Sequence, residues 1–238
     1  MATVAGAESN TVAATSALSS IYADKPPRYF GNARHDIVEL LPTGPDSWVL
    51  ELGCGQGGTG RAAIAARKAG HYVGIELNPA AAEVAAAGLE DVWVGDVETM
   101  NLACLENRFD ALVISEVLEH LTDPWSTLSR LAACVKPGGV VYASSPNIAH
   151  WQVIKGLIFG EFEYSASGVM DRTHLRWFTP ASYRALLEGA GFEVASVTSL
   201  CRPGWKGGLL SALTGRRFDH LFARQIMIVG RRSPGSAK

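Results

Sequence analysis

Val49-Leu50-Glu51-Leu52-Gly53-Cys54-Gly55-Gln56-Gly57-Gly58-Thr59-Gly60 is the stretch from which the fold can be read. An apolar run passes directly into a series of glycines, which is typical of a buried strand that turns at once into a helix. Glycine adopts the backbone angles of such a turn at little cost, and its missing side chain lets a ligand approach the main chain. The stretch therefore predicts a strand, a ligand-binding loop and a helix, in that order.

Strand and helix patterns alternate along the chain from about residue 33 onward. The expected strands are continuous apolar runs, as found where helices cover both faces of a parallel sheet. Asn78–Pro79, Asp123–Pro124 and Thr179–Pro180 each combine a capping side chain with a proline at the first helical position. We predict an α/β fold with a doubly wound, mostly parallel sheet and helices on both faces. The expected strands are 47–52, 72–75, 92–94, 111–115, 140–144, 192–198 and 223–229, and the expected helices are 33–41, 61–69, 79–87, one from 124 and one from 180.

Composition and charge exclude several classes of function. The chain of 238 residues has a formal net charge of −2, so no electrostatic footprint for nucleic acid or an anionic membrane is expected. No window approaches the roughly 18 apolar residues of a membrane span. The four cysteines have neither metal-ligand nor disulfide-framework spacing, so we expect a cytoplasmic protein with no metal site. A disordered tail over residues 1–20, without a signal peptide, and one domain over residues 21–238 are predicted.

Acidic side chains stand at the ends of three successive predicted strands. Glu51 lies within the end of the first, Glu76 ends the second, and Asp96 follows the third. A carboxylate can attract an ammonium group, accept hydrogen bonds from ribose hydroxyls, or accept one from the amino group of adenine. These three positions suit a cationic ligand that contains a ribose and an adenine, and S-adenosylmethionine is such a ligand.

A nicotinamide dinucleotide is the alternative ligand for this loop. Gly53-x-Gly55-x-x-Gly58 satisfies the dinucleotide fingerprint, and Glu76 stands at a suitable distance to hold a ribose. Glu51, however, would repel a pyrophosphate at close range. No second catalytic domain is evident, so an NAD-dependent oxidoreductase is the less favoured reading.

Five motifs follow one another along the chain: Glu51–Gly57, Gly74–Pro79, Gly95–Asp96, Asp110–His120 and Lys136–Gly139. In this order they resemble the motifs of class I (Rossmann-like) S-adenosylmethionine-dependent methyltransferases, of the small-molecule type similar to ubiquinone-biosynthesis and natural-product or sugar enzymes. The resemblance covers about residues 21–230 and implies a seven-stranded sheet with an antiparallel seventh strand.

The resemblance also implies which residues contact the cofactor, S-adenosylmethionine. The adenine and methionine ends would be lined by Val97 and by Ser115 or Glu116, and Tyr22 and Tyr29 would close the pocket or else pack on the first helix. The full expected set is Glu51, Gly53, Gly55, Gly57, Glu76, Leu77, Asp96, Val97, Ser115, Glu116, Tyr22 and Tyr29.

Residues 146–178 fit the strand–helix alternation least well and are rich in aromatic side chains. Because they follow the fifth strand, they would lie beyond its carboxyl end, where ligands bind in such folds. We consider two structures for this segment: a substrate lid, or a helix packed on the edge of the core.

Three histidines are candidates for the general base that a hydroxyl acceptor requires. His174 is our first choice, with Asp171 three residues before it as a possible orienting carboxylate, and His150 is the second choice. His120 also follows a strand end, but a structural role is favoured there. The alternative for Asp171 and His174 is that they only tie the lid to the sheet.

The expected reaction is O-methylation of a small-molecule acceptor in natural-product or sugar biosynthesis. C- or N-methylation stays open, because the acceptor pocket is formed by loops whose course the sequence does not reveal. We expect a small-molecule substrate, no nucleic-acid or membrane partner, and a possible homodimer.

Overall fold

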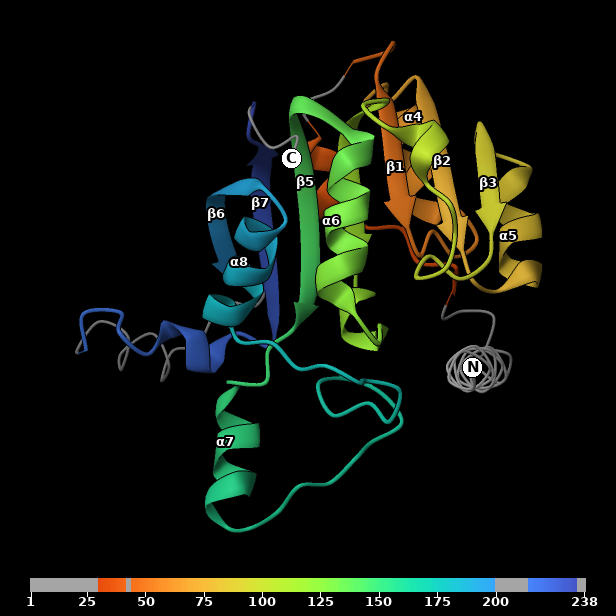
Figure 1. Ribbon diagram of the computed structural model, residues 1–238. Coiled ribbons are helices and arrows are strands. Elements are labelled where there is room, and N and C mark those ends of the chain that lie inside the picture. Colours follow the sequence, from red (N-terminus) through yellow and green to blue (C-terminus); the bar gives the residue numbers. More distant parts are fainter. Residues whose placement is uncertain (1–29, 42–43, 200–213, 235–238) are drawn as a thin grey trace, which may run out of the picture. The chain divides into compact units, whose positions relative to one another are not determined.

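A computed structural model describes residues 30–41, 44–199 and 214–234, and Figure 1 shows its elements. Its strands form a seven-stranded sheet in the order β3-β2-β1-β4-β5-β7-β6. The pairs β1–β2, β2–β3 and β4–β5 are parallel, whereas β7 is antiparallel to both β5 and β6. The predicted fold class, including the antiparallel seventh strand, is therefore confirmed. The predicted tail over residues 1–20, Tyr22 and Tyr29 lie outside the described residues.

The chain divides into two compact units, residues 1–101 and 102–238. The first contains a three-stranded parallel part of the sheet in which β1 and β2 are almost wholly buried. Its helix α5 packs against β2 and β3. The elements of this unit are α3 (His35–Leu40), β1 (Trp48–Leu52), α4 (Gly58–Ala65), β2 (His71–Glu76), α5 (Pro79–Ala86) and β3 (Asp91–Val94).

Helix α4 differs from the prediction at both ends. It begins at Gly58 rather than Arg61, because Gly57 takes a left-handed conformation (φ 78°, ψ 22°) and ends the turn at that point. It ends at Ala65, just before Arg67 with its positive φ of 55°, so Gly70 does not close it. By contrast, α5 begins where the cap-proline pair predicted: the Asn78 side chain accepts a hydrogen bond from the Ala81 amide.

The second unit contains the remaining four strands and the longest helices. Helices α6 and α8 lie over the same face of β5, β7 and β6 (Figure 1), and α8 packs on β6 and β7. Asp123 and Thr179 cap α6 and α8 through their side chains, as the sequence predicted. The elements are η1 (Ala103–Leu105), β4 (Phe109–Ser115), η2 (Leu118–His120), α6 (Pro124–Cys134), β5 (Val135–Pro146), α7 (Trp151–Ile158), α8 (Pro180–Gly189), β6 (Phe192–Ser199), η3 (Asp219–Phe222) and β7 (Gln225–Arg232).

The aromatic-rich segment 146–178 contains the short helix α7 and a long irregular stretch after it. Helix α7 lies beyond the carboxyl end of β5 (Figure 1), and none of its residues is buried. A helix packed on the edge of the core is therefore not what this segment forms. Its action as a substrate lid stays a prediction.

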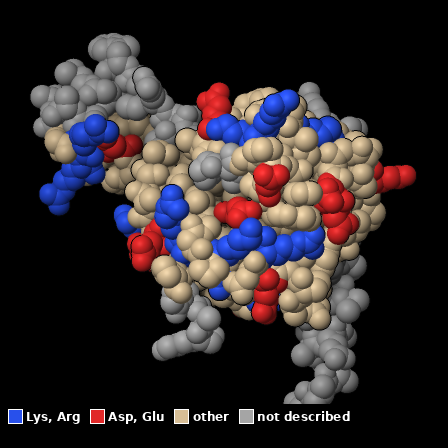
Figure 2. All heavy atoms as spheres, turned by 90° about the horizontal axis from the view of Figure 1, so that it is seen from above, with Lys and Arg blue, Asp and Glu red and all other residues tan. Residues whose placement is uncertain are grey.

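The surface is mixed in charge. On the face seen in Figure 2, lysine and arginine side chains are interspersed with aspartate and glutamate. Within the described ranges, none of the helices has the length and apolar character needed to cross a bilayer.

Candidate functional site

The glycine loop after β1 has the conformation that its sequence requires. Gly53, Gly55 and Gly57 have φ angles of 71°, 54° and 78°, which side-chain-bearing residues rarely adopt. Space is also restricted at Gly55, where a Cβ atom would lie only 2.5 Å from the Phe30 carbonyl oxygen. The loop is held to the neighbouring strand because the Gly53 amide donates to the Ile75 carbonyl at 2.8 Å.

Glu76, at the end of β2, lies directly against this loop. One carboxylate oxygen accepts a hydrogen bond from the Gly55 amide at 2.8 Å, and the other accepts from the Asn78 amide at 2.8 Å. Burial raises the pKa of Glu76, and the hydrogen bonds from Asn78, Gly55 and Leu77 act in the opposite direction. A carboxylate has about four acceptor positions, so capacity for ribose hydroxyls is left.

Glu51 is a buried acid with an unsatisfied oxygen. Its side chain is 3% exposed, and within the described residues neither its Oε2 nor the nearby Tyr72 hydroxyl has a hydrogen-bond partner. Burial raises the pKa of Glu51 to about 7. A buried carboxylate without a partner is costly, and an ammonium group from a ligand would relieve that cost.

Asp96 lies at the end of the third strand, next to β2. The Gly95 amide donates to the Glu76 carbonyl at 2.9 Å, which brings the two strand ends together. The Asp96 Oδ1 accepts from the Glu98 amide at 2.9 Å and so closes a turn, and Val97 in this turn is buried. The predicted acids of the first unit thus stand at the ends of adjacent parallel strands, as the sequence argument required.

In the second unit, serine side chains hold Glu116, the residue after β4. Glu116 has a positive φ of 57°, which is a strained conformation for a residue with a side chain. The Ser144 hydroxyl donates to its carboxylate at 3.1 Å and lies 3.2 Å from the Ser115 hydroxyl. Ser115 and Glu116, both predicted site residues, therefore belong to one hydrogen-bonded group.

Glu119, His120 and His174 form a buried cluster that we call the imidazole cluster. Their exposed fractions are 1%, 7% and 7%, and the two imidazole centroids are 4.8 Å apart. One potential ligand atom from each of the three lies within 4.8 Å of the others. The Ser145 hydroxyl donates to Glu119 Oε2 at 3.2 Å, whereas Glu119 Oε1 has no hydrogen-bond partner among the described residues.

The tautomers of the two rings follow from their backbone partners. His120 Nδ1 lies 3.1 Å from the Thr173 carbonyl and His174 Nδ1 lies 3.0 Å from the Val169 carbonyl. A carbonyl oxygen only accepts, so each Nδ1 carries the proton and the Nε2 of each neutral ring is basic. Such a set can accept a proton or hold a divalent cation, and ligating histidines usually donate their other N–H to a carbonyl in this way.

Asp171 stabilises the turn that precedes His174. Its Oδ1 accepts from both the amide and the hydroxyl of Thr173, at 2.9 Å each, while the ring of His174 donates to Val169. One oxygen of the carboxylate therefore holds the turn before His174, and its orienting of the imidazole stays a prediction. Glu119, which the sequence analysis did not propose, is the acid beside the two rings.

His150 caps helix α7. Its Nδ1 accepts from the Gln152 amide at 3.4 Å, so its ring proton resides on Nε2. Burial and the neighbouring Arg224 both lower its pKa. Nδ1 of His150 is bonded to the helix and Nε2 already carries the proton. His150 is therefore a weaker candidate for the general base than its position in the sequence implied.

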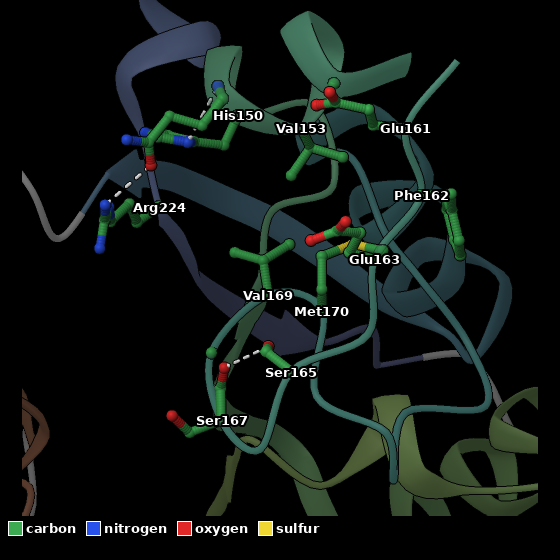
Figure 3. Close-up of a pocket in the computed structure, with 13 residues that line it drawn as sticks. His150, Val153, Glu161, Phe162, Glu163, Ser165, Ser167, Val169, Met170 and Arg224 are labelled. Carbon is green, nitrogen blue, oxygen red and sulfur yellow. Dashed lines mark hydrogen bonds between the residues drawn. The ribbon is translucent and has the colours of Figure 1, made fainter. Parts of the chain in front are cut away.

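A cavity of about 340 Å³ adjoins His150, between α7, the segment 161–170 and Arg224 (Figure 3). Apolar side chains contribute Val153, Phe162, Val169 and Met170 to its wall. The sequence analysis did not identify these residues, because a pocket between a helix and an irregular loop has no local pattern.

Comparisons with known proteins agree with this geometry. A family model described as "Methyltransferase domain" matches residues 27–197. The ubiquinone biosynthesis O-methyltransferase of Azorhizobium caulinodans is 30% identical over 194 residues, which cover 75% of this chain and 72% of that protein. The corresponding protein of Xylella fastidiosa strain M23 is 27% identical over 188 residues, covering 76% and 75%.

Solved structures share the fold. A methyltransferase in complex with the Haloferax volcanii Trm112 methyltransferase activator has a TM-score of 0.63 at 19% identity, covering 91% of this chain and 97% of that one. An S-adenosylmethionine-dependent methyltransferase from Mesorhizobium loti has a TM-score of 0.59 at 17% identity, covering 85% and 99%. The match to the family model and to the curated relatives sets aside the oxidoreductase reading of the glycine loop. The chain belongs to the methyltransferase-domain family, as a class I S-adenosylmethionine-dependent methyltransferase.

Proposed function

We propose that the protein transfers a methyl group from S-adenosylmethionine to a hydroxyl oxygen of a small-molecule acceptor. One observation carries the proposal: buried acids stand at the ends of adjacent strands, with Glu76 bonded to the glycine loop and Glu51 lacking a partner for one oxygen. When bound, the cofactor would supply an electrophilic methyl group on a sulfonium. Every other task falls to side chains of this chain.

The first unit supplies a cofactor site whose donors and acceptors match that ligand. Glu51 would pair with the ammonium group, and Glu76 would accept from the ribose hydroxyls while keeping the Gly55 amide in place. Asp96 and Val97 would contact the adenine. The orphaned Glu51 oxygen is the part of the site that fits a cation and would reject a phosphate.

The second unit supplies the proton acceptor. As the new oxygen–carbon bond forms and the sulfur–carbon bond breaks, the hydroxyl proton must go to a base, and His174 is our first candidate. Its Nε2 is the basic atom, and its ring lies beside His120 and Glu119. We retain His150 as the second candidate, although its capping role leaves it less suited.

The acceptor has two candidate classes. The curated relatives are named for ubiquinone biosynthesis, whereas the sequence analysis predicted natural-product or sugar O-methylation. Both alternatives share a hydroxyl on a small molecule. A carbon or amine acceptor with its own lone pair would not require a base, and this difference separates C- and N-methylation from the proposal.

Calorimetry tests the cofactor part directly. We expect S-adenosylmethionine and S-adenosylhomocysteine to bind, and NADH not to bind. Glu51→Gln should weaken both cofactor forms, because both contain the ammonium group, whereas the exposed substitution Glu83→Gln on α5 should leave them unchanged. If neither S-adenosylmethionine nor S-adenosylhomocysteine binds, the proposed function is refuted.

A further inference from the structure

We propose that the cavity beside α7 binds the acceptor and that Arg224 recognises a carboxylate on it, so that the acceptor is a hydroxylated aromatic acid. This inference rests on the proposed function and names the class of molecule that receives the methyl group. The argument uses the second unit alone.

The size and walls of the cavity suit one aromatic ring. Its volume of about 340 Å³ falls at the lower end of the usual range for small-molecule sites. Val153 from α7 faces Val169 and Met170 from the loop across the space in Figure 3. Phe162 at its edge is held by edge-to-face contacts with Tyr164 (5.4 Å between centroids) and Trp177 (6.0 Å). Aliphatic, thioether and aromatic groups all pack favourably against an aromatic ring.

Hydrogen-bond donors gather at one end of the cavity. Arg224 Nη2 donates to the Gln152 side-chain oxygen at 2.8 Å, which holds the guanidinium at the amino end of α7. His150, beside it in Figure 3, carries its ring proton on Nε2 and so is also a donor. A planar guanidinium with several N–H groups matches a carboxylate better than any neutral group.

The backbone of Arg224 is firmly positioned. The Arg224 carbonyl accepts from the Asn147 amide at 2.9 Å, and the buried Asn147 side chain donates to the carbonyls of Ala223 and His220 at 2.8 and 2.7 Å. Because the backbone of Arg224 is already fixed, little backbone entropy is lost there when a ligand binds.

Charge at the rim gives an acceptor one preferred orientation. Glu161 and Glu163, which also line the cavity, lie on the loop rather than at the Arg224 end. A carboxylate is attracted by Arg224 and repelled by these two acids. The uncharged, hydroxyl-bearing part of the ring would then lie away from Arg224.

One wall residue of the cavity is hydrogen-bonded to His174 of the imidazole cluster, through Nδ1 and not through the basic Nε2. The carbonyl of Val169, a wall residue, accepts hydrogen bonds from His174 Nδ1 at 3.0 Å and from the Trp177 indole at 3.3 Å. The wall that would contact the acceptor is thus hydrogen-bonded to our first candidate base.

A matched pair of probes tests the proposal: 4-hydroxybenzoate and its neutral isostere 4-hydroxybenzamide, each titrated into protein saturated with S-adenosylhomocysteine. We expect the acid to bind about tenfold more tightly, from a charge-assisted hydrogen bond. Arg224→Gln should abolish this preference, and Arg224→Lys should retain part of it. Lys155→Gln, which removes the same charge from an exposed position on α7 outside the cavity, should leave the preference intact.

Methyl NMR of the unmodified protein provides a second measurement that does not depend on any variant folding. The acid should shift the methyl signals of Val153, Val169 and Met170, and leave those of Ile75 in the first unit unchanged. Equal binding of the two probes, or shifts elsewhere only, would overturn the inference. If S-adenosylhomocysteine itself does not bind, the proposed function is wrong. This result differs from equal binding of the two probes, which would overturn only the inference about the acceptor.

Discussion

The glycine loop of the first unit and the imidazole cluster of the second unit are built in opposite ways. In the loop, most of the structure is local: Gly53, Gly55 and Gly57 lie within five residues, and their backbone angles form the bend. In the second unit, the imidazole cluster joins His120 to His174, 54 positions further along the chain. A local site is specified by backbone preferences, whereas a distributed site is specified by packing, so substitutions should affect the two differently.

His174→Ala tests the distributed site and should have the largest effect. We expect kcat to fall about 100- to 10,000-fold if His174 removes the acceptor proton. Cofactor affinity, measured by calorimetry, should be unchanged. Turnover that barely changes would point instead to a carbon or amine acceptor. Asp171→Asn should lower the melting temperature, because it weakens the two hydrogen bonds that Thr173 donates to the carboxylate.

Gly55→Ala tests the local site. A methyl group there meets the Phe30 carbonyl and is strained by the positive φ, so the loop must shift. We expect cofactor affinity to fall at least about 100-fold and the free energy of unfolding to fall by about 1–3 kcal/mol. Gly44→Ala is the matched control, because no atom lies within 4 Å of the added methyl group. If both variants bind the cofactor equally well, the conformational argument for the loop is wrong.

Glu51 should make cofactor affinity depend on pH. Its pKa of about 7 means that the carboxylate, which attracts the ammonium group, forms as pH rises through 7. Cofactor affinity should therefore increase by about tenfold between pH 6 and 8, and Glu51→Gln should flatten this profile.

The stability of the ligand-free protein should change with the opposite sign. Between the ordinary pKa of 4.5 and about 7, the folded protein keeps a proton that the unfolded chain releases. Stability then falls as pH rises across this window, by roughly 3 kcal/mol at most, and stays low above it. Urea denaturation at pH 5 and pH 8 should show a larger decrease in the native chain than in Glu51→Gln, where the raised pKa values of the buried Glu76 and Glu119 still contribute. A parallel decrease in the variant would assign the effect to another group.

The smallest effect is expected on the outer face of α7. Ile158 is 74% exposed, so Ile158→Ser should change the free energy of unfolding by less than about 0.5 kcal/mol. Ile228 in β7 is fully buried, and Ile228→Ala should cost about 2–5 kcal/mol by thermal or urea denaturation. A large loss from the Ile158 variant would mean that this face is covered in solution.

Local sequence rules succeeded where neighbours along the chain decide the conformation. Proline after a capping side chain marked the beginnings of α5, α6 and α8, because the first turn of a helix lacks internal hydrogen-bond partners and a nearby side chain supplies them. The same rules misplaced the ends of α4, where the conformation of Gly57 and of Arg67 decided the boundaries.

The sequence by itself determined the strand–loop–helix unit, the alternation that produces a parallel sheet, and the acids at its strand ends. Each of these depends on residues close together in the chain. Only the tertiary structure decided that His174 lies beside Glu119 and His120, and that Arg224 reaches the cavity beside α7. These pairings join segments whose separation along the chain carries no periodic signal, and they are selected only when the core packs.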